Sequence, residues 1–392
     1  MSKRHAEIAG AGIVGLTAAA ALAQRGWSVR VHERGEELRE IGAGIFLWQN
    51  AQRALKGIGA FDEVVHRSQI ADAWELLDDR LRTVQREWMF SRDEPLHACL
   101  RPDLLAGLAD AAERAGAEIV TRSTVAGARA DGTLILESGE ELRADLVIGA
   151  DGVNSKVRDS LGLTAHYSDM RDGASRHLIA RTASDPDRDI LEYWRQQRRV
   201  GVVPCSPEHV YVYLACPAWD VEARAQNPDF REHWKQSFPH LADVFDRIDD
   251  DEGWYSFKEV RCHSWSLGKV AIGGDAAHGM SPTLGQAACV AMHGAYALAE
   301  ALSIYPRQSD ALRAWEVSER PTVDSTQRFS RYYGYVNARW PRWATDARSA
   351  FVWGLGRSRN AQARINCAPT HVPDFSKTPV RPAETPPLRV AA

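Results

Sequence analysis

The stretch AEIAGAGIVGLTAAAALAQRGWSVRVHE, residues 6–33, decides the fold. Its apolar beginning predicts a strand, the small residues of 16–25 predict a helix, and residues 28–32 predict a second strand. The turn between the first strand and the helix has the pattern GxGxxG, formed by Gly10, Gly12 and Gly15. The order of strand, glycine-rich turn, helix and strand predicts a βαβ unit that binds a dinucleotide.

Each residue of this pattern has a physical role. The first glycine permits the tight turn, the second lets the backbone approach a pyrophosphate, and the third lets the helix pack closely on the strand. The carboxylate at the end of the second strand suits the hydroxyl groups of an adenosine ribose. We therefore expect the nucleotide to be bound by Gly10, Gly12, Ile13, Val14, Gly15 and Glu33.

The same stretch has features of a secretory signal, because Lys3 and Arg4 precede an apolar run. Glu7 and three glycines interrupt that run, and the dinucleotide pattern accounts for all of them. We therefore reject secretion and expect a cytoplasmic protein.

The composition narrows the function further. The chain has 392 residues and a formal net charge of -4, which gives no general attraction to nucleic acid. No apolar run reaches the roughly 20 residues of a membrane span. The six cysteines show neither a CxxC pair nor the spacing of metal ligands, so we expect reduced cysteines and no metal site. These residues are Cys99, Cys205, Cys216, Cys262, Cys289 and Cys367.

Two further motifs follow predicted strands. The apolar run 146–150 predicts a buried parallel strand that ends in GADGVNSKVR, residues 149–158. The run 269–272 predicts another strand, which leads into GGDAAHGMSPTLGQ, residues 273–286, and then a helix over 287–302. Ligands bind at such strand ends in open α/β sheets, so we expect both motifs at one site.

Between these motifs the pattern changes. Residues 166–262 are rich in short β-branched and aromatic runs, and 200–203 and 210–215 predict a hairpin. Residues 230–247 predict one helix, and 311–335 predict another.

Together the three motifs resemble those of the FAD-dependent aromatic hydroxylases, the single-component flavoprotein monooxygenases of the para-hydroxybenzoate hydroxylase fold. The resemblance extends to about residue 335. Within this family, residues 42–50 and 199–211 resemble those of members that hydroxylate and open a pyridine ring. Many members have GQG followed by Asn where this chain has Gln286-Ala287-Ala288-Cys289, which weakens an assignment to the salicylate-type hydroxylases.

The resemblance implies an α/β fold, α+β overall, with a Rossmann-like FAD-binding domain and an inserted substrate domain on a mixed or antiparallel sheet. We expect the FAD-binding domain at 1–70, 98–165 and 263–335, and the substrate domain at 71–97 and 166–262. A C-terminal helical segment at 336–368 and a proline-rich tail at 369–392, disordered or draped over the surface, would complete the chain.

The resemblance also assigns residues to FAD. Arg34 or Arg39 would assist Glu33 at the ADP half, and Arg101 would open a helix beside the flavin. Asp151 and Gly152 form the family's DG pair, which Ser155 and Arg158 complete. The ribityl-pyrophosphate region would lie on Asp275, and the flavin ring would be lined by Pro282, Gly285, Gln286, Ala287 and Ala288. Amides at the N-terminus of the 287–302 helix would stabilise the negative charge of reduced flavin.

The resemblance further implies a substrate pocket that uses Arg199, Tyr211, Trp74 and Pro282. A guanidinium binds a carboxylate in a fork, a tyrosine donates a hydrogen bond, and an indole stacks on a ring. Arg199, Tyr211 and His293 are the candidate catalytic residues, with Tyr211 or His293 mediating deprotonation of a substrate hydroxyl. The alternatives are a surface position for Arg199, core positions for Tyr211 and Trp74, and a structural role for His293.

The implied activity is hydroxylation of a hydroxylated aromatic or N-heteroaromatic acid by O2 through a flavin hydroperoxide, with or without opening of the ring, and with NADH or NADPH as co-substrate. Two alternatives stay open: a flavoenzyme of the same fold with other redox chemistry on a larger substrate, and a non-catalytic flavin-binding protein. The Trp- and Arg-rich residues 339–364 predict a homodimer contact or a helix packed on the catalytic body rather than a nucleic-acid or membrane patch.

Overall fold

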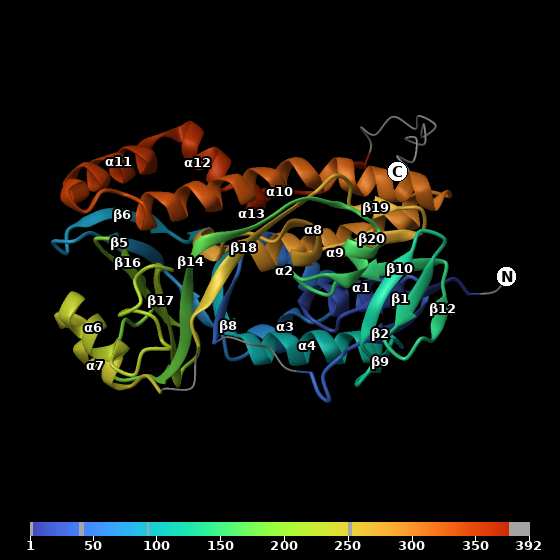
Figure 1. Cartoon of the computed structure of the whole chain (residues 1–392), viewed down its shortest axis with the longest axis horizontal. Helices are drawn as coiled ribbons and strands as arrows, with labels where there is room; N and C mark the ends of the chain where they lie inside the picture. Colours follow the sequence, from blue (N-terminus) through green and yellow to red (C-terminus); the bar gives the residue numbers. More distant parts are fainter. Residues whose placement is uncertain (1–2, 39–42, 92–93, 250–252, 376–392) are drawn as a thin grey trace.

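A six-stranded sheet forms the centre of the nucleotide-binding half (Figure 1). The computed structural model describes residues 3–38, 43–91, 94–249 and 253–375. In spatial order the strands are β19 (Ser266–Leu267), β20 (Val270–Ile272), β13 (Leu146–Gly149), β1 (His5–Ala9), β2 (Ser28–His32) and β9 (Glu118–Val120). All neighbours are parallel except β19 and β20. The carboxyl ends of β1, β13 and β20 therefore meet at one edge, as the three motifs predicted.

Helix α1 (Ile13–Gln24) packs directly on this sheet, where it contacts β1 and β2. Three further helices pack against α1, namely α2 (Gln49–Ile58), α4 (Arg101–Arg114) and α9 (Ala287–Ile304). Helix α1 packs against both α4 and α9, and α2 also contacts α9. Among the described residues, α9 alone is long and apolar enough to cross a membrane, but 61% of its length is buried in the protein. We therefore describe α9 as a core helix.

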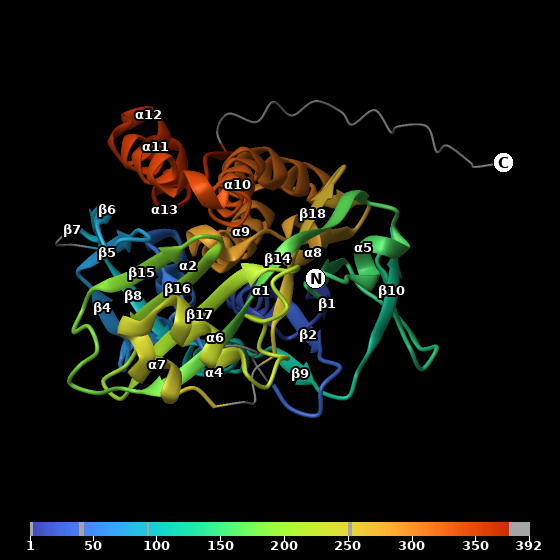
Figure 2. The same ribbon diagram turned by 60° about the vertical axis from the view of Figure 1, so that its left-hand side comes forward.

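A seven-stranded sheet forms the second half (Figure 2). Its strands are, in order, β18 (Tyr255–Cys262), β14 (Thr164–Ala180), β17 (His209–Pro217), β16 (Arg198–Pro204), β15 (Ile190–Arg195), β5 (Ala73–Leu77) and β6 (Thr83–Trp88). The pairs are antiparallel except β15 with β5, so the sheet is mixed. The predicted hairpin is present as β16 and β17.

Smaller elements connect the two halves. Strands β10 (Val125–Arg129), β11 (Thr133–Leu136) and β12 (Glu141–Arg143) form one small sheet, and β3 (Gly44–Leu47), β4 (Gln69–Ala71), β7 (Phe90–Ser91) and β8 (Glu94–Leu100) form another. Short helices are α3 (Phe61–Val65), α5 (Lys156–Ser160), α8 (Asp275–His278) and the 3-10 turn Pro282–Leu284. The mixed α/β class is confirmed, whereas the exact domain limits stay a prediction.

The expectation of one continuous helix over 230–247 is wrong. The segment forms α6 (Phe230–Ser237), a 3-10 turn (Pro239–Leu241) and α7 (Ala242–Asp246). Pro239 has no backbone N–H and disfavours helical geometry at the residue before it. Phe238 accordingly has φ -129° and ψ 68°. Its side chain and those of Trp234 and Phe245 still pack into one core cluster on the seven-stranded sheet.

The C-terminal part packs on both halves. Helix α10 (Gln308–Ala338) runs along the molecule and is followed by α11 (Thr345–Arg357), α12 (Arg359–Ile365) and α13 (Cys367–Thr370) (Figure 1). Arg348 of α11 is 1% exposed, and its Nη2 donates to Asp79 at 2.6 Å. This Arg- and Trp-rich segment is thus packed on the catalytic body. The predicted tail begins inside α13, and its residues 376–392 lie outside the described residues.

The closest backbone approach in the βαβ unit occurs at Gly15. A Cβ atom there would lie 1.9 Å from the Gly10 carbonyl oxygen, whereas a Cβ on Gly12 would meet nothing within 4 Å. We predict that Gly15→Ala lowers the free energy of unfolding by at least the 1–3 kcal/mol, roughly, that overpacking costs. Gly12→Ala is the matched control and should change it by less than about 0.5 kcal/mol. Urea unfolding measures both values, and equal stability of the two variants would contradict the close contact.

Candidate active site

One large cavity lies where the two halves meet. Its volume is about 430 Å³. The predicted residues that line it are Gly12, Ile13, Val14, Trp74, Arg101, Gly152, Arg199, Tyr211, Asp275, Pro282, Gly285, Ala287 and Ala288. They come from α1, β5, α4, β16, β17, α8 and α9 and from the loops that precede α1, follow β13 and precede α9. The fold therefore brings parts of all three motifs together with the expected substrate residues.

At the nucleotide end, Glu33 binds backbone amides. Its Oε2 accepts from the Ala11 amide at 3.1 Å and its Oε1 accepts from the Gly35 amide at 2.9 Å. The turn itself is left-handed at Gly10, with φ +96°, and a Cβ there would lie 2.5 Å from the Ala150 carbonyl oxygen. The open space at Gly12 and the first turn of α1 give a cradle of backbone amides that suits a pyrophosphate. These observations fit FAD.

Within the DG motif, Gly152 lines the cavity, whereas Asp151 bonds the start of α5. The Asp151 carboxylate accepts from the Ser155 hydroxyl at 2.6 Å and from the Lys156 amide at 2.7 Å, so it caps α5. Arg158 is 2% exposed, and its Nη1 donates to the carbonyl oxygens of Val153 and Ala276 at 2.9 and 3.3 Å. This arginine ties the second motif to the third. Asp151 itself is not among the residues that line the cavity.

The third motif places an acid and a helix end at the cavity. The Asp275 side chain is open to the cavity but surrounded by protein, and this burial raises its pKa while Arg101 and Arg176 oppose the rise. Gly285 has φ +63°, and its carbonyl oxygen accepts from the Trp48 indole at 2.9 Å. The first turn of α9 then faces the cavity through Ala287. A helix N-terminus there stabilises negative charge.

Aromatic and basic side chains of the seven-stranded sheet line the other end. Arg199 is 4% exposed, and its Nε and Nη1 have no hydrogen-bond partner. Its Nη1 lies 3.9 Å from Glu192 Oε1, and its guanidinium lies 5.5 Å from the centre of the Tyr213 ring. Glu192, buried as well, accepts from the Trp194 indole at 2.6 Å and from the Tyr213 hydroxyl. A buried carboxylate thus partly balances the buried guanidinium.

Tyr211 is buried beside this arginine. A Cβ on Gly44 would lie 2.7 Å from the Tyr211 ring, so only glycine leaves room for the tyrosine. Burial raises the Tyr211 pKa, while Arg176, Arg101 and Arg199 lower it. The hydroxyl is therefore protonated at neutral pH and is available as a hydrogen-bond donor.

Several expected residues do not reach the cavity. Gly10, Gly15, Glu33, Arg34 and Gln286 do not line it, and Arg39 lies outside the described residues. Gln286 is 2% exposed and lines a neighbouring apolar pocket.

His293 is also not brought to the cavity, although it was a candidate base. It follows Cys289 by one helical turn, and its imidazole lies beside Glu319 of α10 and His371.

Sequence reasoning missed several polar groups at or near the cavity. Arg176 and Lys258 line it from β14 and β18, where no local pattern marked them. Tyr213 could have been found, because it lies two residues after Tyr211 and therefore on the same face of the strand. Glu192 carried a signal as well, since it is an acid within the apolar run of β15.

Comparisons with known proteins agree with this geometry. The model of the FAD binding domain family matches residues 4–327. The chain is 39% identical over 344 residues to a probable 2-heptyl-3-hydroxy-4(1H)-quinolone synthase of Rhodococcus erythropolis, covering 86% of this chain and 89% of that protein. It is 37% identical over 376 residues to the 2-heptyl-3-hydroxy-4(1H)-quinolone synthase of Mycobacteroides abscessus, covering 92% and 97%.

Among solved structures, the tetrameric form of 2-methyl-3-hydroxypyridine-5-carboxylic acid oxygenase superposes with a TM-score of 0.84 at 33% identity. The match covers 96% of this chain and 100% of that one. The predicted resemblance to flavoprotein aromatic hydroxylases is thereby confirmed. The chain belongs to the FAD binding domain family and is an enzyme, an FAD-dependent monooxygenase of the aromatic hydroxylase type.

Proposed function

We propose that the enzyme hydroxylates a hydroxylated aromatic or N-heteroaromatic acid, with NADH or NADPH as the reductant. In the overall reaction one atom of O2 enters the ring, the other leaves as water, and the nicotinamide is oxidised. The likeness to a hydroxypyridine carboxylic acid oxygenase supports a heteroaromatic acid and includes ring opening among the outcomes. FAD, when bound, supplies the redox chemistry with O2.

The observation that carries the proposal is the Arg199 guanidinium. A charged group is costly to bury without partners, yet its Nε and Nη1 lack them at the cavity. Glu192 is 3.9 Å away and already accepts two hydrogen bonds, so it compensates only part of the charge. A substrate carboxylate would complete the pairing in a bidentate fork.

Other residues would position the ring. Trp74 and Phe46, whose ring centres are 5.0 Å apart, offer an aromatic surface at the cavity. The Tyr211 hydroxyl would donate to a polar group of the substrate, since its raised pKa keeps it protonated. The seven-stranded sheet would exclude water from the reacting centre, and the backbone of α1 and α9 would hold FAD against it.

The proposal is tested by aerobic oxidation of NADH and NADPH with the FAD-loaded enzyme. The panel contains hydroxybenzoates, hydroxypyridines and hydroxypyridine carboxylates, and product masses are measured under ¹⁸O2. Stimulated oxidation with one labelled oxygen in the product supports the proposal, and a ring-opened labelled product supports the heteroaromatic form. Oxidation that no acid stimulates would refute it.

A second candidate is hydroxylation of an alkylated quinolone, favoured by an apolar pocket of about 80 Å³ beside the cavity. The two spaces share Trp74 and Thr283, and the pocket is also lined by Leu76, Val352 and Leu355. One relative is a synthase of 2-heptyl-3-hydroxy-4(1H)-quinolone, a ring that carries a seven-carbon chain. Such a chain would lie in this pocket.

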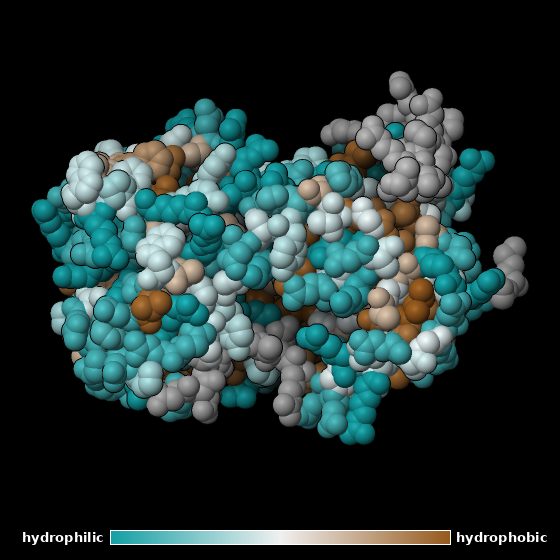
Figure 3. Space-filling view, viewed as in Figure 1, coloured by the Kyte–Doolittle hydropathy of each residue, from teal (hydrophilic) through white to brown (hydrophobic). Residues whose placement is uncertain are grey.

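We also propose self-association through α11, as the predicted homodimer requires. Trp343, Phe351 and Trp353 are 89%, 45% and 48% exposed. Figure 3 shows apolar side chains gathered over α11 and α12 at the upper left. Exposed clusters of this kind mark contact surfaces. Light scattering would measure the oligomeric state, and a monomer at micromolar concentration would contradict this proposal.

Replacing Arg199 should impair recognition of the acid. We expect Arg199→Gln to raise KM for a carboxylate substrate about 100-fold, because charge-assisted hydrogen bonds contribute roughly 1.5–3 kcal/mol each. Preference for the acid over its carboxamide should disappear at the same time, which a merely structural role would not cause. Arg195→Gln, at an exposed position on the neighbouring strand β15, is the control and should retain the preference. An unchanged acid preference in Arg199→Gln would refute the anion-binding role.

The buried carboxyl group of Asp172 should make the stability of the folded protein depend on pH. It is 7% exposed, its Oδ1 has no partner, and burial raises its pKa from 3.8 to about 6 against the opposing charges of Arg199 and Arg339. The folded state therefore holds this proton more tightly than the unfolded state. The resulting stabilisation is complete below pH 4 and is lost as the pH rises through 6.

Asp172→Asn mimics the protonated side chain, so it should be more stable than the wild type at pH 7, by about 3 kcal/mol at most. The difference should shrink toward zero near pH 4. Urea unfolding at the two pH values measures it. Asp169→Asn, at a more exposed carboxylate paired with Lys258, serves as the control and should not be stabilised at pH 7. A wild type that is as stable as Asp172→Asn at pH 7 would contradict the assignment.

A larger side chain in the apolar pocket should distinguish the two candidate substrates by their KM values. Leu355→Trp should raise KM for 2-heptyl-4(1H)-quinolone at least about tenfold, since about 1.4 kcal/mol of lost binding corresponds to that factor. KM for a small hydroxylated acid should stay within twofold, and Leu355→Met should leave both values unchanged. Steady-state kinetics with both compounds measures these KM values. A quinolone KM that is insensitive to Leu355→Trp would exclude this pocket as the alkyl site.

A further inference from the structure

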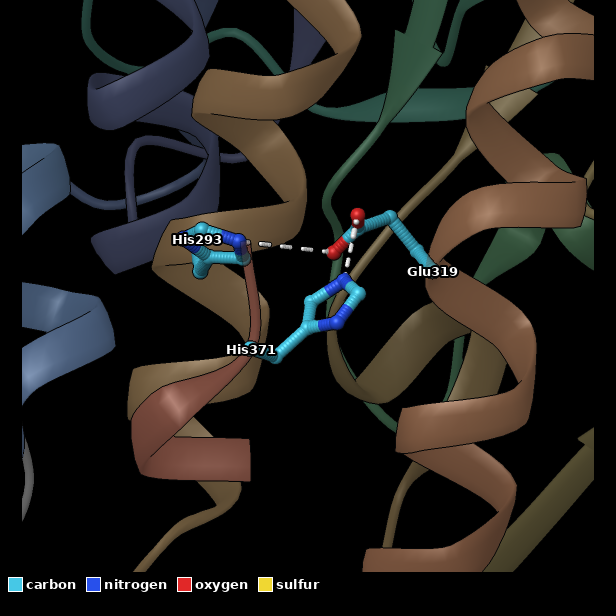
Figure 4. A group of neighbouring side chains, drawn as sticks. All are labelled: His293, Glu319 and His371. Carbon is cyan, nitrogen blue, oxygen red and sulfur yellow. Dashed lines mark hydrogen bonds and ion pairs between the residues drawn. The ribbon is translucent and has the colours of Figure 1, made fainter. Parts of the chain in front are cut away.

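Three potential metal ligands meet outside the cavity. His293 lies on α9, Glu319 on α10, and His371 directly follows α13. Figure 4 shows their side chains pointing toward one another from the three elements, with Glu319 between the two imidazoles. The fold thus joins residues that are 26 and 52 positions apart in sequence (319 minus 293, and 371 minus 319).

The donor atoms lie at nearly metal-binding separations. His371 Nε2 is 2.9 Å from Glu319 Oε1, and His293 Nε2 is 3.8 Å from Glu319 Oε2. One donor atom of each residue lies within 4.8 Å of the other two. Bonds of about 2.0–2.1 Å to a tetrahedral ion place donor atoms about 3.3 Å apart. Small side-chain rotations would therefore bring all three onto one ion.

The imidazole of His293 is buried and lacks hydrogen-bond partners, which suits a metal ligand. It is 4% exposed, and neither ring nitrogen makes a hydrogen bond. An unpartnered buried imidazole is costly, and a metal ion would give one of its nitrogen atoms a partner.

The other two residues are already oriented. His371 Nδ1 lies 3.2 Å from the Thr322 hydroxyl, which leaves Nε2 directed at Glu319. The Ser318 hydroxyl donates to Glu319 Oε1 at 3.2 Å. Glu319 is 2% exposed, so its carboxylate is sheltered from water. Outer contacts of this kind fix the ring and carboxylate of metal ligands.

We propose that His293, Glu319 and His371 bind one divalent transition-metal ion of the zinc type, with water as the fourth ligand. Two imidazoles and one carboxylate form a donor set that zinc accepts. The ion would clamp α9, α10 and the segment after α13, so its role is structural and separate from the cavity. Arg53 donates to the carbonyl oxygens of Pro369 and His371 at 3.1 and 2.5 Å and holds the same segment.

The donor atoms of the cluster set the selectivity of the site. A site with a single coordinating carboxylate favours zinc over the harder Mg²⁺ and Ca²⁺, which need oxygen ligands.

The test uses the full-length FAD-loaded enzyme without a polyhistidine tag. After treatment with a chelator, calorimetric titration with Zn²⁺ should give one site per chain. Co²⁺ should give d–d absorption bands of a tetrahedral site at wavelengths beyond those of flavin. Mg²⁺ should not compete. An enzyme that binds no stoichiometric Zn²⁺, or that shows no such bands with Co²⁺, would overturn the proposal and leave the cluster as an ion-paired network.

Variants assign the ligands. His293→Gln, Glu319→Gln and His371→Gln should each weaken Zn²⁺ binding by more than the 10- to 100-fold, roughly, that loss of an outer contact costs. His371→Cys should restore binding, because a thiolate replaces the imidazole as a zinc ligand. His66→Gln is the control, since His66 is exposed and bonds only its own turn.

Folding of each variant is checked by retained flavin absorbance and circular dichroism. If the folded His293→Gln and His371→Gln enzymes bind Zn²⁺ as tightly as the wild type, the ion lies elsewhere and the proposal fails. Failure of His371→Cys to bind more tightly than His371→Gln would count against direct ligation in the same way.

Discussion

The close contact between α1 and β1 at Gly15 and Gly10 is the constraint on which the nucleotide-binding half depends. Because no side chain separates the helix from the strand, the first turn of α1 lies directly at the strand end, where its amides face the cavity. The rest of α1 is small and buried almost throughout, so α9 approaches it from the other side. The position of α9 in turn sets where Ala287 and Ala288 meet the cavity.

The substrate end depends on a balance of buried charge. Arg199 and Glu192 lie on adjacent strands of the seven-stranded sheet, in a register that pairs Glu192 with Gly201. A buried ion pair is weak evidence for stability, because desolvation offsets much of the attraction. Here the pair is imperfect at 3.9 Å, and the arginine retains unpartnered nitrogen atoms at the cavity. That arrangement favours recognition of an anion over stability of the fold. Rigid strands hold the two side chains in place better than loops would.

The sequence predicted the features that are local in the chain. The GxGxxG turn, the two strands that end in GADG and GGDAAH, and the hairpin around Pro204 each follow from residues adjacent in sequence. Arg199 and Tyr211 were found through a family resemblance, and their roles stay predictions. Arg176 and Asp172 could not be predicted, because their positions depend on the register of β14 with its neighbours. The helix over 230–247 failed because Pro239 outweighed a continuous apolar face.

The cluster of His293, Glu319 and His371 lay beyond local reasoning for a similar reason, since three separate elements create it. Helix α10 makes further long-range contacts through buried polar residues. Glu319, Gln327 and Ser330 are buried on this helix. Gln327 donates to the Gly279 carbonyl oxygen at 2.9 Å, and the Ser330 carbonyl oxygen accepts from Thr283 at 2.5 Å.

One stripe of α10 therefore reaches from the histidine cluster to the segment that precedes α9. At its far end, a Cβ on Gly334 would lie 3.5 Å from an Asp172 carboxylate oxygen, beside the buried arginine. Residues at spacings of three and four share one helical face, so a rigid helix fixes these contacts relative to one another. A displacement of α10 would consequently shift Thr283, because the hydroxyl of that residue bonds the helix backbone. The position of the cavity wall therefore depends on α10 as well as on the motifs that line the cavity.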